Sequence, residues 1–300
     1  MLDRMQQWSN QKIIIFMLSL SGLMVLIGLV VNFSQTKESG NYELKVATTI
    51  FPVYDIVRNI APEDVEVVLL LPPGVSPHTY ELSPSDAAKV KNSAVLFSID
   101  QALDGWAVDS ARNLSIGEVV ELSENIDLIE EDATVDPHYW LSVPNALLMS
   151  MTVSRELIKV FPDYKMEIES NYKKYLETLI ALDRTMRDSF GKLDNRKIAT
   201  FHESWRYFAK DYGIDIVAVY EKQVGNQLTA RDLAEFLKTV SEQNVRAVFS
   251  EEQFADDQIS VAAKDAGVYL SELDPIGGIE GRDSYVKLML FNTERIVNAK

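Results

Sequence analysis

A long stretch of helical periodicity, residues 163–190, divides residues 44–300 into two parts of similar length. Its apolar side chains recur at steps of one, three and four residues, as they do on one face of an α-helix. Pro162 precedes the stretch and Gly191 follows it, and both residue types are typical of helix boundaries. At about 1.5 Å per residue, such a helix is roughly 42 Å long. It predicts a stiff linker with a separate folded body on either side.

Short runs of β-branched residues alternate with amphipathic segments on both sides of this helix. Such alternation predicts parallel strands covered by helices. Before the helix we expect strands at 45–51, 65–71, 94–100 and 118–122, and helices at 53–60, 84–91 and 103–112. After it we expect strands at 197–201, 215–219, 247–250 and 268–271, and helices at 204–212, 230–243, 258–266 and 284–298.

The predicted fold class is therefore α/β, with two open parallel-sheet lobes joined by one long rigid helix. The N-terminal lobe is assigned to residues 44–162, the linking helix to 163–191 and the C-terminal lobe to 192–300. A cleft of limited opening is expected between lobes that are joined in this way. The two lobes begin alike, with KVAT at 45–48 and KIAT at 197–200, which is typical of a duplicated plan.

The first 43 residues are predicted to attach the chain to a membrane. Residues 13–33 are almost wholly apolar, and about 21 residues suffice to cross a hydrocarbon core as a helix. A cleaved signal peptide is the alternative, but its apolar stretch is normally only about 7–15 residues. Arg4 and Lys12 precede the span, so the positive-inside rule places the short N-terminal stub in the cytoplasm. We expect a transmembrane anchor, a polar tether and an extracytoplasmic main body, which would be secreted if the helix were cleaved.

Net charge and the lack of cysteine restrict the possible functions. The chain has 45 acidic and 29 basic residues, for a net charge of -16. Such a surface repels phosphate backbones and attracts cations, so no nucleic-acid partner is expected. Without cysteine, the chain has no disulfides, thiolate nucleophiles, zinc–thiolate sites or acylated lipoprotein cysteine. Any metal must therefore bind to nitrogen and oxygen.

The chain has three histidines, and each lies in a turn-like context at or after the end of a predicted strand. His78 stands in LPPGVSPHTY, His138 in DPHYWL, and His202 directly after the first strand of the second lobe. Asp274 follows the last strand, in SELDP. Ligands of open α/β sheets bind at the carboxyl ends of strands. We predict that these three imidazoles and one carboxylate meet around one divalent cation, and this donor set suits zinc.

Four motifs around these residues resemble the signatures of the metal-binding substrate proteins of zinc and manganese ABC importers. They are VSPHTYELSPSD at 75–86, DPHYW at 136–140, FH at 201–202 and LDPIG at 273–277. The resemblance covers about residues 44–300 and implies two lobes bridged by a long helix, with the metal in the cleft between them. Transferred motif by motif, it implies His78, His138, His202 and Asp274 as the ligands. Manganese-type members typically have Glu at the position of His202, so the match is closer to the zinc-type branch.

The sequence departs from the family pattern at two places. Many members carry a lipobox cysteine or a simple cleaved signal, so the anchor at 13–33 is inferred from this sequence alone. Many zinc-type members also have a long His-rich loop before Asp-Pro-His, whereas the stretch 121–132 is short and has no histidine. We interpret it as a solvated loop. Four glutamates are alternative oxygen ligands or partners of the ligands: Glu81, Glu203, Glu251 and Glu252.

The function predicted from these features is extracytoplasmic capture of Zn²⁺ by a monomer, with delivery to an ABC permease and its ATPase and no chemical turnover. Mn²⁺ as cargo in the same family is one alternative. A second is a zinc hydrolase with Glu203 as general base, although HExxH is absent and Asp274 would fill the position a hydrolase leaves for water. A third is an adhesin or a purely structural protein. Neither a hydrolase nor an adhesin explains four convergent ligand motifs.

Overall fold

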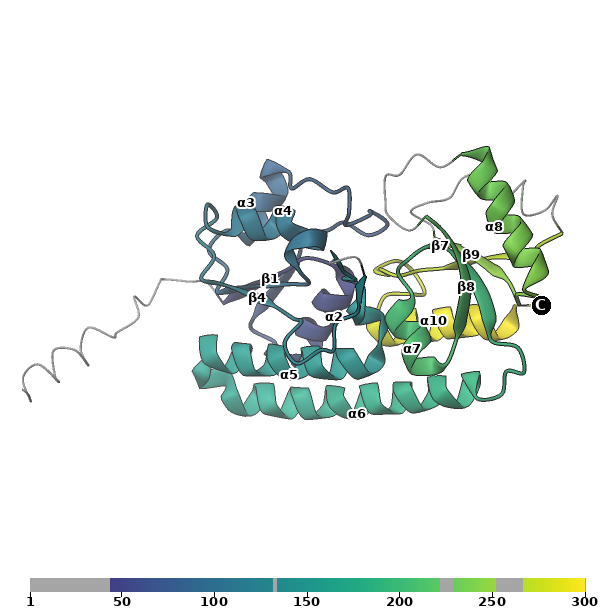
Figure 1. Ribbon diagram of the computed structural model, residues 1–300. Helices are drawn as coiled ribbons and strands as arrows, with labels where there is room; N and C mark the ends of the chain where they lie inside the picture. The colour runs from purple at the N-terminus through teal and green to yellow at the C-terminus, as the bar shows by residue number, and fades with distance from the viewer. Residues whose placement is uncertain (1–43, 132–133, 222–228, 252–266, 300) are drawn as a thin grey trace, which may run out of the picture. The chain divides into compact units, whose positions relative to one another are not determined.

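A computed structural model describes residues 44–131, 134–221, 229–251 and 267–299, and it contains two α/β lobes above a pair of long helices (Figure 1). These residues belong to one compact unit, 42–300. The predicted membrane anchor at 13–33 and the tether lie outside the described residues. Within the described ranges, the structure has no helix that is both long and apolar enough to span a bilayer.

The N-terminal lobe has the strands and helices that the sequence predicts. Besides a short antiparallel pair, β5 (Glu130–Glu131) and β6 (Thr134–Val135), four strands of this lobe pair in parallel in the order β2-β1-β3-β4. They are β1 (Lys45–Thr48), β2 (Glu66–Leu69), β3 (Val95–Ser98) and β4 (Glu118–Glu121), and the helices are α2 (Phe51–Ile60), α3 (Pro84–Val90) and α4 (Gln101–Ala111). Every residue of β3 is buried, as expected for a parallel strand with helices on both faces.

The C-terminal lobe repeats this plan. Its strands pair in parallel in the order β10-β9-β7-β8. They are β7 (Lys197–His202), β8 (Asp215–Glu221), β9 (Val248–Glu251) and β10 (Leu270–Leu273), and the helices are α7 (Arg206–Tyr212), α8 (Ala230–Glu242) and α10 (Tyr285–Asn298). The predicted helix at 258–266 lies outside the described residues. In both sheets the spatial order is second, first, third and fourth strand, which agrees with a duplicated plan.

The predicted long helix is α6 (Lys165–Phe190), which follows a short 3-10 turn at Pro162–Tyr164. It runs beneath both lobes and packs against α2 of the first and α10 of the second (Figure 1). Its buried side chains belong to the apolar stripe: Ile168, Tyr175, Leu179, Leu182, Met186 and Phe190. A second long helix, α5 (Val143–Val160), lies alongside α6 and is absent from the predicted elements.

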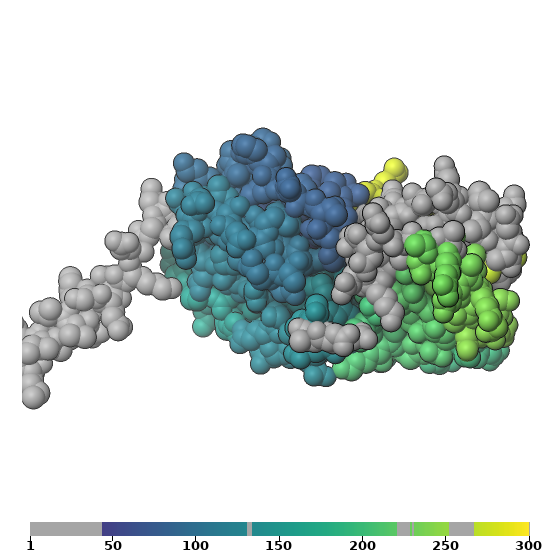
Figure 2. Space-filling view, turned by 45° about the horizontal axis from the view of Figure 1, so that its top comes forward, coloured from purple at the N-terminus to yellow at the C-terminus, as the bar shows by residue number. Residues whose placement is uncertain are grey.

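Buried hydrogen bonds join the two lobes directly. The indole N–H of Trp140 donates to the carbonyl of Pro275 at 2.7 Å, and the hydroxyl of Tyr285 donates to the carbonyl of Trp140 at 2.6 Å. The backbone N–H of Tyr285 donates to Asp55 Oδ2 at 3.0 Å, which ties the start of α10 to α2. The largest hydrophobic cluster also takes in residues of both lobes. The lobes are therefore held by a shared core as well as by α6, and Figure 2 shows one face of this pair.

Candidate metal centre

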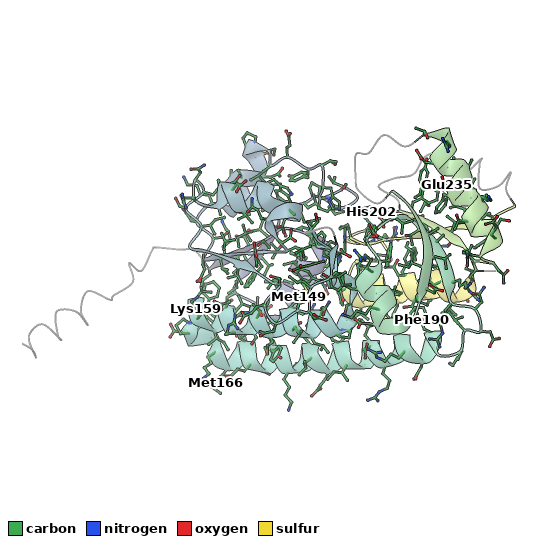
Figure 3. All side chains as sticks on the ribbon, viewed as in Figure 1. Met149, Lys159, Met166, Phe190, His202 and Glu235 are labelled. Atoms are coloured by element: carbon green, nitrogen blue, oxygen red, sulfur yellow. The ribbon has the colours of Figure 1, made fainter. Side chains whose placement is uncertain are left out.

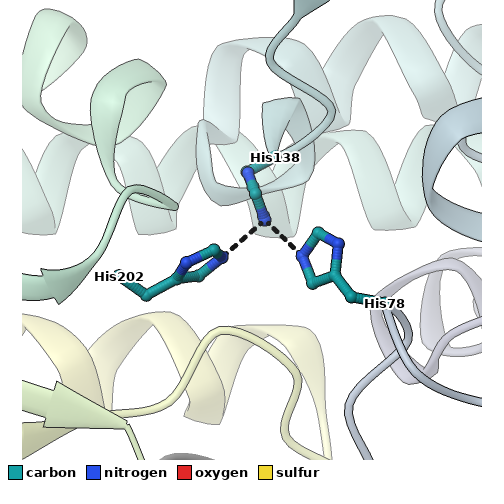
Figure 4. A group of neighbouring side chains, drawn as sticks. All are labelled: His78, His138 and His202. Carbon is teal, nitrogen blue, oxygen red and sulfur yellow. Dashed lines mark hydrogen bonds between the residues drawn. The ribbon is translucent and has the colours of Figure 1, made fainter. Parts of the chain in front are cut away.

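The three histidine rings meet where the two lobes come together (Figure 4). Nε2 of His138 lies 3.2 Å from Nε2 of His78 and 3.3 Å from Nε2 of His202. Taking one ring nitrogen from each, the three atoms lie within 4.8 Å of one another. A tetrahedral zinc with bonds of about 2.0–2.1 Å holds its ligand nitrogens about 3.3–3.4 Å apart. The spacing around His138 therefore matches that of ligands on one small cation.

Each ring reaches this point from a different element. His78 lies on the loop after β2, His138 directly precedes a 3-10 turn at Tyr139–Leu141, and His202 is the last residue of β7. Of the three, Figure 3 labels His202. The loop of His78 is fastened to α4, since the indole N–H of Trp106 donates to the carbonyl of Pro77 at 3.2 Å. The prediction that all three histidines lie together is thus matched by the geometry of the described residues.

Asp136 orients His138. Its Oδ1 lies 2.8 Å from Nδ1 of His138 and also accepts the backbone N–H of His138 at 3.0 Å. A carboxylate only accepts, so Nδ1 carries the hydrogen and Nε2 presents its lone pair to the centre. A carboxylate behind a metal-binding imidazole also raises its basicity. Asp136 was not among the residues predicted from the sequence, although its position two residues before His138 was a usable signal.

Asp136→Asn is expected to weaken zinc binding about 10- to 100-fold, because the imidazole of His138 loses its negatively charged partner while its ring stays in place. Competition with a chelating dye measures the change. Asp127→Asn is the matched control, since Asp127 is an exposed residue of the same segment that pairs with Lys210. An affinity of Asp136→Asn equal to that of the control would show that Asp136 does not support the centre.

Glu251 stands beside His202 at the point where the strand order of the second sheet reverses. It ends β9, which pairs with β7, and it lines the cavity in front of the three histidines. Its Oε1 accepts hydrogen bonds from the hydroxyl of Ser204 and the indole N–H of Trp205. Burial raises its pKa to about 7. Glu251, one of the alternative carboxylates named from the sequence, therefore fastens the turn that follows His202.

Asp274 follows β10 as predicted, but its carboxylate is engaged by other groups. Its Oδ1 accepts the backbone N–H groups of Ile276 and Gly277, each at 2.9 Å, and its Oδ2 lies 3.0 Å from Nη1 of Arg282. Among the described residues, the cluster of close metal-ligating atoms consists of the three histidines alone. Asp274 is buried next to Pro275, which lines the cavity.

Two other glutamates named from the sequence do not join this cluster. Glu81 and Glu203 are described and lie outside it, and Glu252 falls outside the described residues.

The stability of the metal-free protein should fall as the pH is lowered from about 6.5 to 4. Burial lowers the pKa of His78 to about 4, electrostatic repulsion by His138 acts in the same direction, and the charge of Asp136 opposes both. Over this range the unfolded chain takes up a proton on His78 that the folded chain excludes. The free energy of unfolding therefore decreases by at most about 1.4 kcal/mol for each pH unit between the pKa of His78 in the unfolded chain and its pKa in the folded chain.

Denaturant titrations in the presence of a chelator measure this slope. His78→Gln removes the titrating group and should show a flatter pH dependence. Identical slopes in the two proteins would exclude His78 as the source.

Comparisons with known proteins agree over most of the chain. Residues 46–299 match the family model ZnuA, zinc-uptake complex component A periplasmic. The manganese ABC transporter substrate-binding lipoprotein scaA of Streptococcus gordonii is 26% identical over 91% of this chain and 95% of its own. The high-affinity zinc uptake system protein ZnuA of Bacillus subtilis (strain 168) is 25% identical over 88% of this chain and 90% of its own. The structure of the periplasmic zinc-binding protein TroA from Treponema pallidum superposes with a TM-score of 0.77 at 26% identity, covering 85% of this chain and 98% of its own.

Proposed function

The chain belongs to the ZnuA family of metal-binding, substrate-binding proteins of ABC importers, and from this premise we propose that it captures Zn²⁺ and delivers it to an ABC permease. The observation that supports zinc most directly is the cluster of three imidazoles, in which Nε2 of His138 lies 3.2 and 3.3 Å from Nε2 of the other two. Imidazole is a ligand that suits zinc, which also stands above manganese in the Irving–Williams order.

The proposed ligands are His78, His138, His202 and Asp274. The three imidazoles supply neutral nitrogen and Asp274 supplies one oxygen, which completes four-coordination. With every position taken by the protein, no open site remains for an activated water, so the proposal includes no chemical turnover.

Manganese is the second candidate cargo. Relatives named for manganese and for zinc resemble this chain equally, at 26% and 25% identity. Sequence similarity therefore does not separate the two metals. The donor set does favour one of them, since manganese prefers oxygen-rich octahedral sites and the cluster here consists of nitrogen.

The proposal also includes the place of action. Relatives are named as lipoproteins or as periplasmic, so the described part of the chain is taken to work outside the cytoplasmic membrane. This chain has no cysteine for a lipid, and the apolar residues 13–33 are proposed to tether it instead. The proposed partners are the permease and its ATPase, and the chain is proposed to bind them as a monomer.

Native mass spectrometry of the metal-stripped full chain tests the cargo. The protein is given equimolar Zn²⁺ and Mn²⁺, and the expected spectrum has one zinc per chain. A single bound manganese would assign the chain the second cargo, and the lack of either metal would refute the proposal. The variant with all three histidines replaced by alanine is the matched blank.

A further inference from the structure

Arg282 reaches the carboxylate that is proposed as the fourth ligand. Its Nη1 lies 3.0 Å from Oδ2 of Asp274, and the two side chains are only 12% and 2% exposed. Its guanidinium also stacks on Phe291, with Cζ 4.5 Å from the ring centroid, and lies 3.4 Å from Glu272. The guanidinium is thus held beside Asp274 by its surroundings, out of the bulk solvent.

Backbone hydrogen bonds also hold Arg282 and Asp274 in place. The N–H of Gly278 donates to the carbonyl of Arg282 at 2.9 Å, so the chain folds back and returns Arg282 to Asp274. Gly277 permits the fold with a φ of +72°, and a Cβ there would lie 3.0 Å from the Arg282 carbonyl oxygen. Asn292 pairs with the backbone N–H and carbonyl of Asp274 at 2.8 and 2.7 Å.

Counting lone pairs shows what remains for a metal. Oδ1 of Asp274 accepts two backbone N–H groups, which use both of its lone pairs. Oδ2 forms a close ion pair with Arg282, whose Nη1 lies 3.0 Å away, so the guanidinium neutralises part of the negative charge of this oxygen. A cation on the three imidazoles would therefore receive a single, partly neutralised oxygen from Asp274. It would also lie near the positive charge of Arg282.

We propose that Arg282 is an internal competitor for Asp274 that lowers the affinity of the centre for divalent cations and speeds their release. This inference rests on the proposed function and adds a residue that tunes it. A substrate-binding protein has to release its metal ion. The guanidinium of Arg282, paired with Asp274, weakens metal binding while Asp274 remains available as a ligand. The same ion pair stabilises the metal-free protein, because it neutralises a carboxylate that is otherwise buried.

Competition by Arg282 and a merely structural role of Arg282 predict opposite changes in metal affinity when this residue is replaced. If Arg282 only supports the loop, its removal disturbs Asp274 and weakens metal binding. If it competes, its removal frees Oδ2 and strengthens binding. The interaction at stake is a close, largely buried ion pair, and its removal is expected to change the affinity by about 10- to 100-fold.

The test replaces Arg282 with Met, which keeps an apolar stem against Phe291. We expect Arg282→Met to bind Zn²⁺ about 10- to 100-fold more tightly than the wild type and to release it more slowly to a chelator in stopped flow. The metal-free variant should unfold at a lower temperature than the metal-free wild type, and zinc should raise its unfolding temperature by more than it raises that of the wild type. Arg282→Gln, which keeps a neutral donor, should fall between the two and serves if the Met variant does not fold.

Two further variants complete the experiment. Arg295→Met removes the other guanidinium that stacks on Phe291, at 4.9 Å, and should leave affinity unchanged. In an Asp274→Asn background, Arg282→Met should have little effect, since the competition needs the carboxylate. Weaker or unchanged zinc binding by Arg282→Met, with a wild type that binds zinc, would overturn the role of Arg282 alone. A wild type that binds no zinc would instead overturn the proposed function.

Discussion

Replacing His138 with alanine is expected to weaken zinc binding by about 100- to 1000-fold. Nε2 of His138 lies within 3.3 Å of Nε2 of both other histidines, so it is the central nitrogen of the three. Structural zinc sites with four ligands have binding free energies of about 10–16 kcal/mol, or about 2.5–4 kcal/mol per ligand. Isothermal titration calorimetry, with a competing chelator for the wild type, measures the loss.

Ser76→Ala is the matched control for this substitution. Ser76 lines the same cavity and carries no group that ligates zinc, so its variant should bind as the wild type does. Circular dichroism of the metal-free His138→Ala protein establishes that it is folded, and His138→Gln supplies a variant closer in size. A folded His138→Ala protein with wild-type affinity would remove this residue from the ligand set.

Excess zinc is expected to stabilise the protein by about 4 kcal/mol when its free concentration is a thousand times the dissociation constant. The gain arises because the folded chain alone gathers the ligands. For a chain of this size the midpoint of thermal unfolding should rise by roughly 8–16 °C. Differential scanning calorimetry measures the shift, and a chelator should reverse it.

His138→Ala provides the control for that measurement as well, since its midpoint should respond far less to the same zinc concentration. Mg²⁺ at equal concentration should leave the wild type unchanged, because magnesium prefers oxygen ligands. A midpoint that zinc does not move would contradict the proposed centre, since tight binding to the folded state alone must stabilise it.

The sequence predicted most of the architecture because periodicity and β-branched runs are local signals. It missed α5, which has a mixed buried face: Ser150, Thr152 and Ser154 are buried together with Met149 and Val153. Hydroxyl side chains at core positions interrupt the apolar stripe that identifies an amphipathic helix. The stripe of α6 has no such interruption, because its buried positions are all aliphatic or aromatic.

The site was predictable in part. The histidines could be placed together because each was predicted at or after the carboxyl end of a strand, where the ligands of open α/β sheets bind, with two in one lobe and one in the other. The ion pair of Asp274 with Arg282 could not, since it depends on how the turn at 277–282 folds back. The hydrogen bond from Trp205 to Glu251 could not be predicted either, because it depends on the pairing of β7 with β9, which joins residues almost fifty positions apart.

The hydrogen bonds of Trp140 and Tyr285 restrict how cargo leaves. Swinging the two lobes apart would rupture several buried contacts at once and expose a common core, which is a large energetic barrier. His78, in contrast, lies on a loop that is fastened to its own lobe through Trp106 and Pro77. We therefore expect a cation to leave this centre through a small local displacement of the loop after β2 rather than through separation of the lobes.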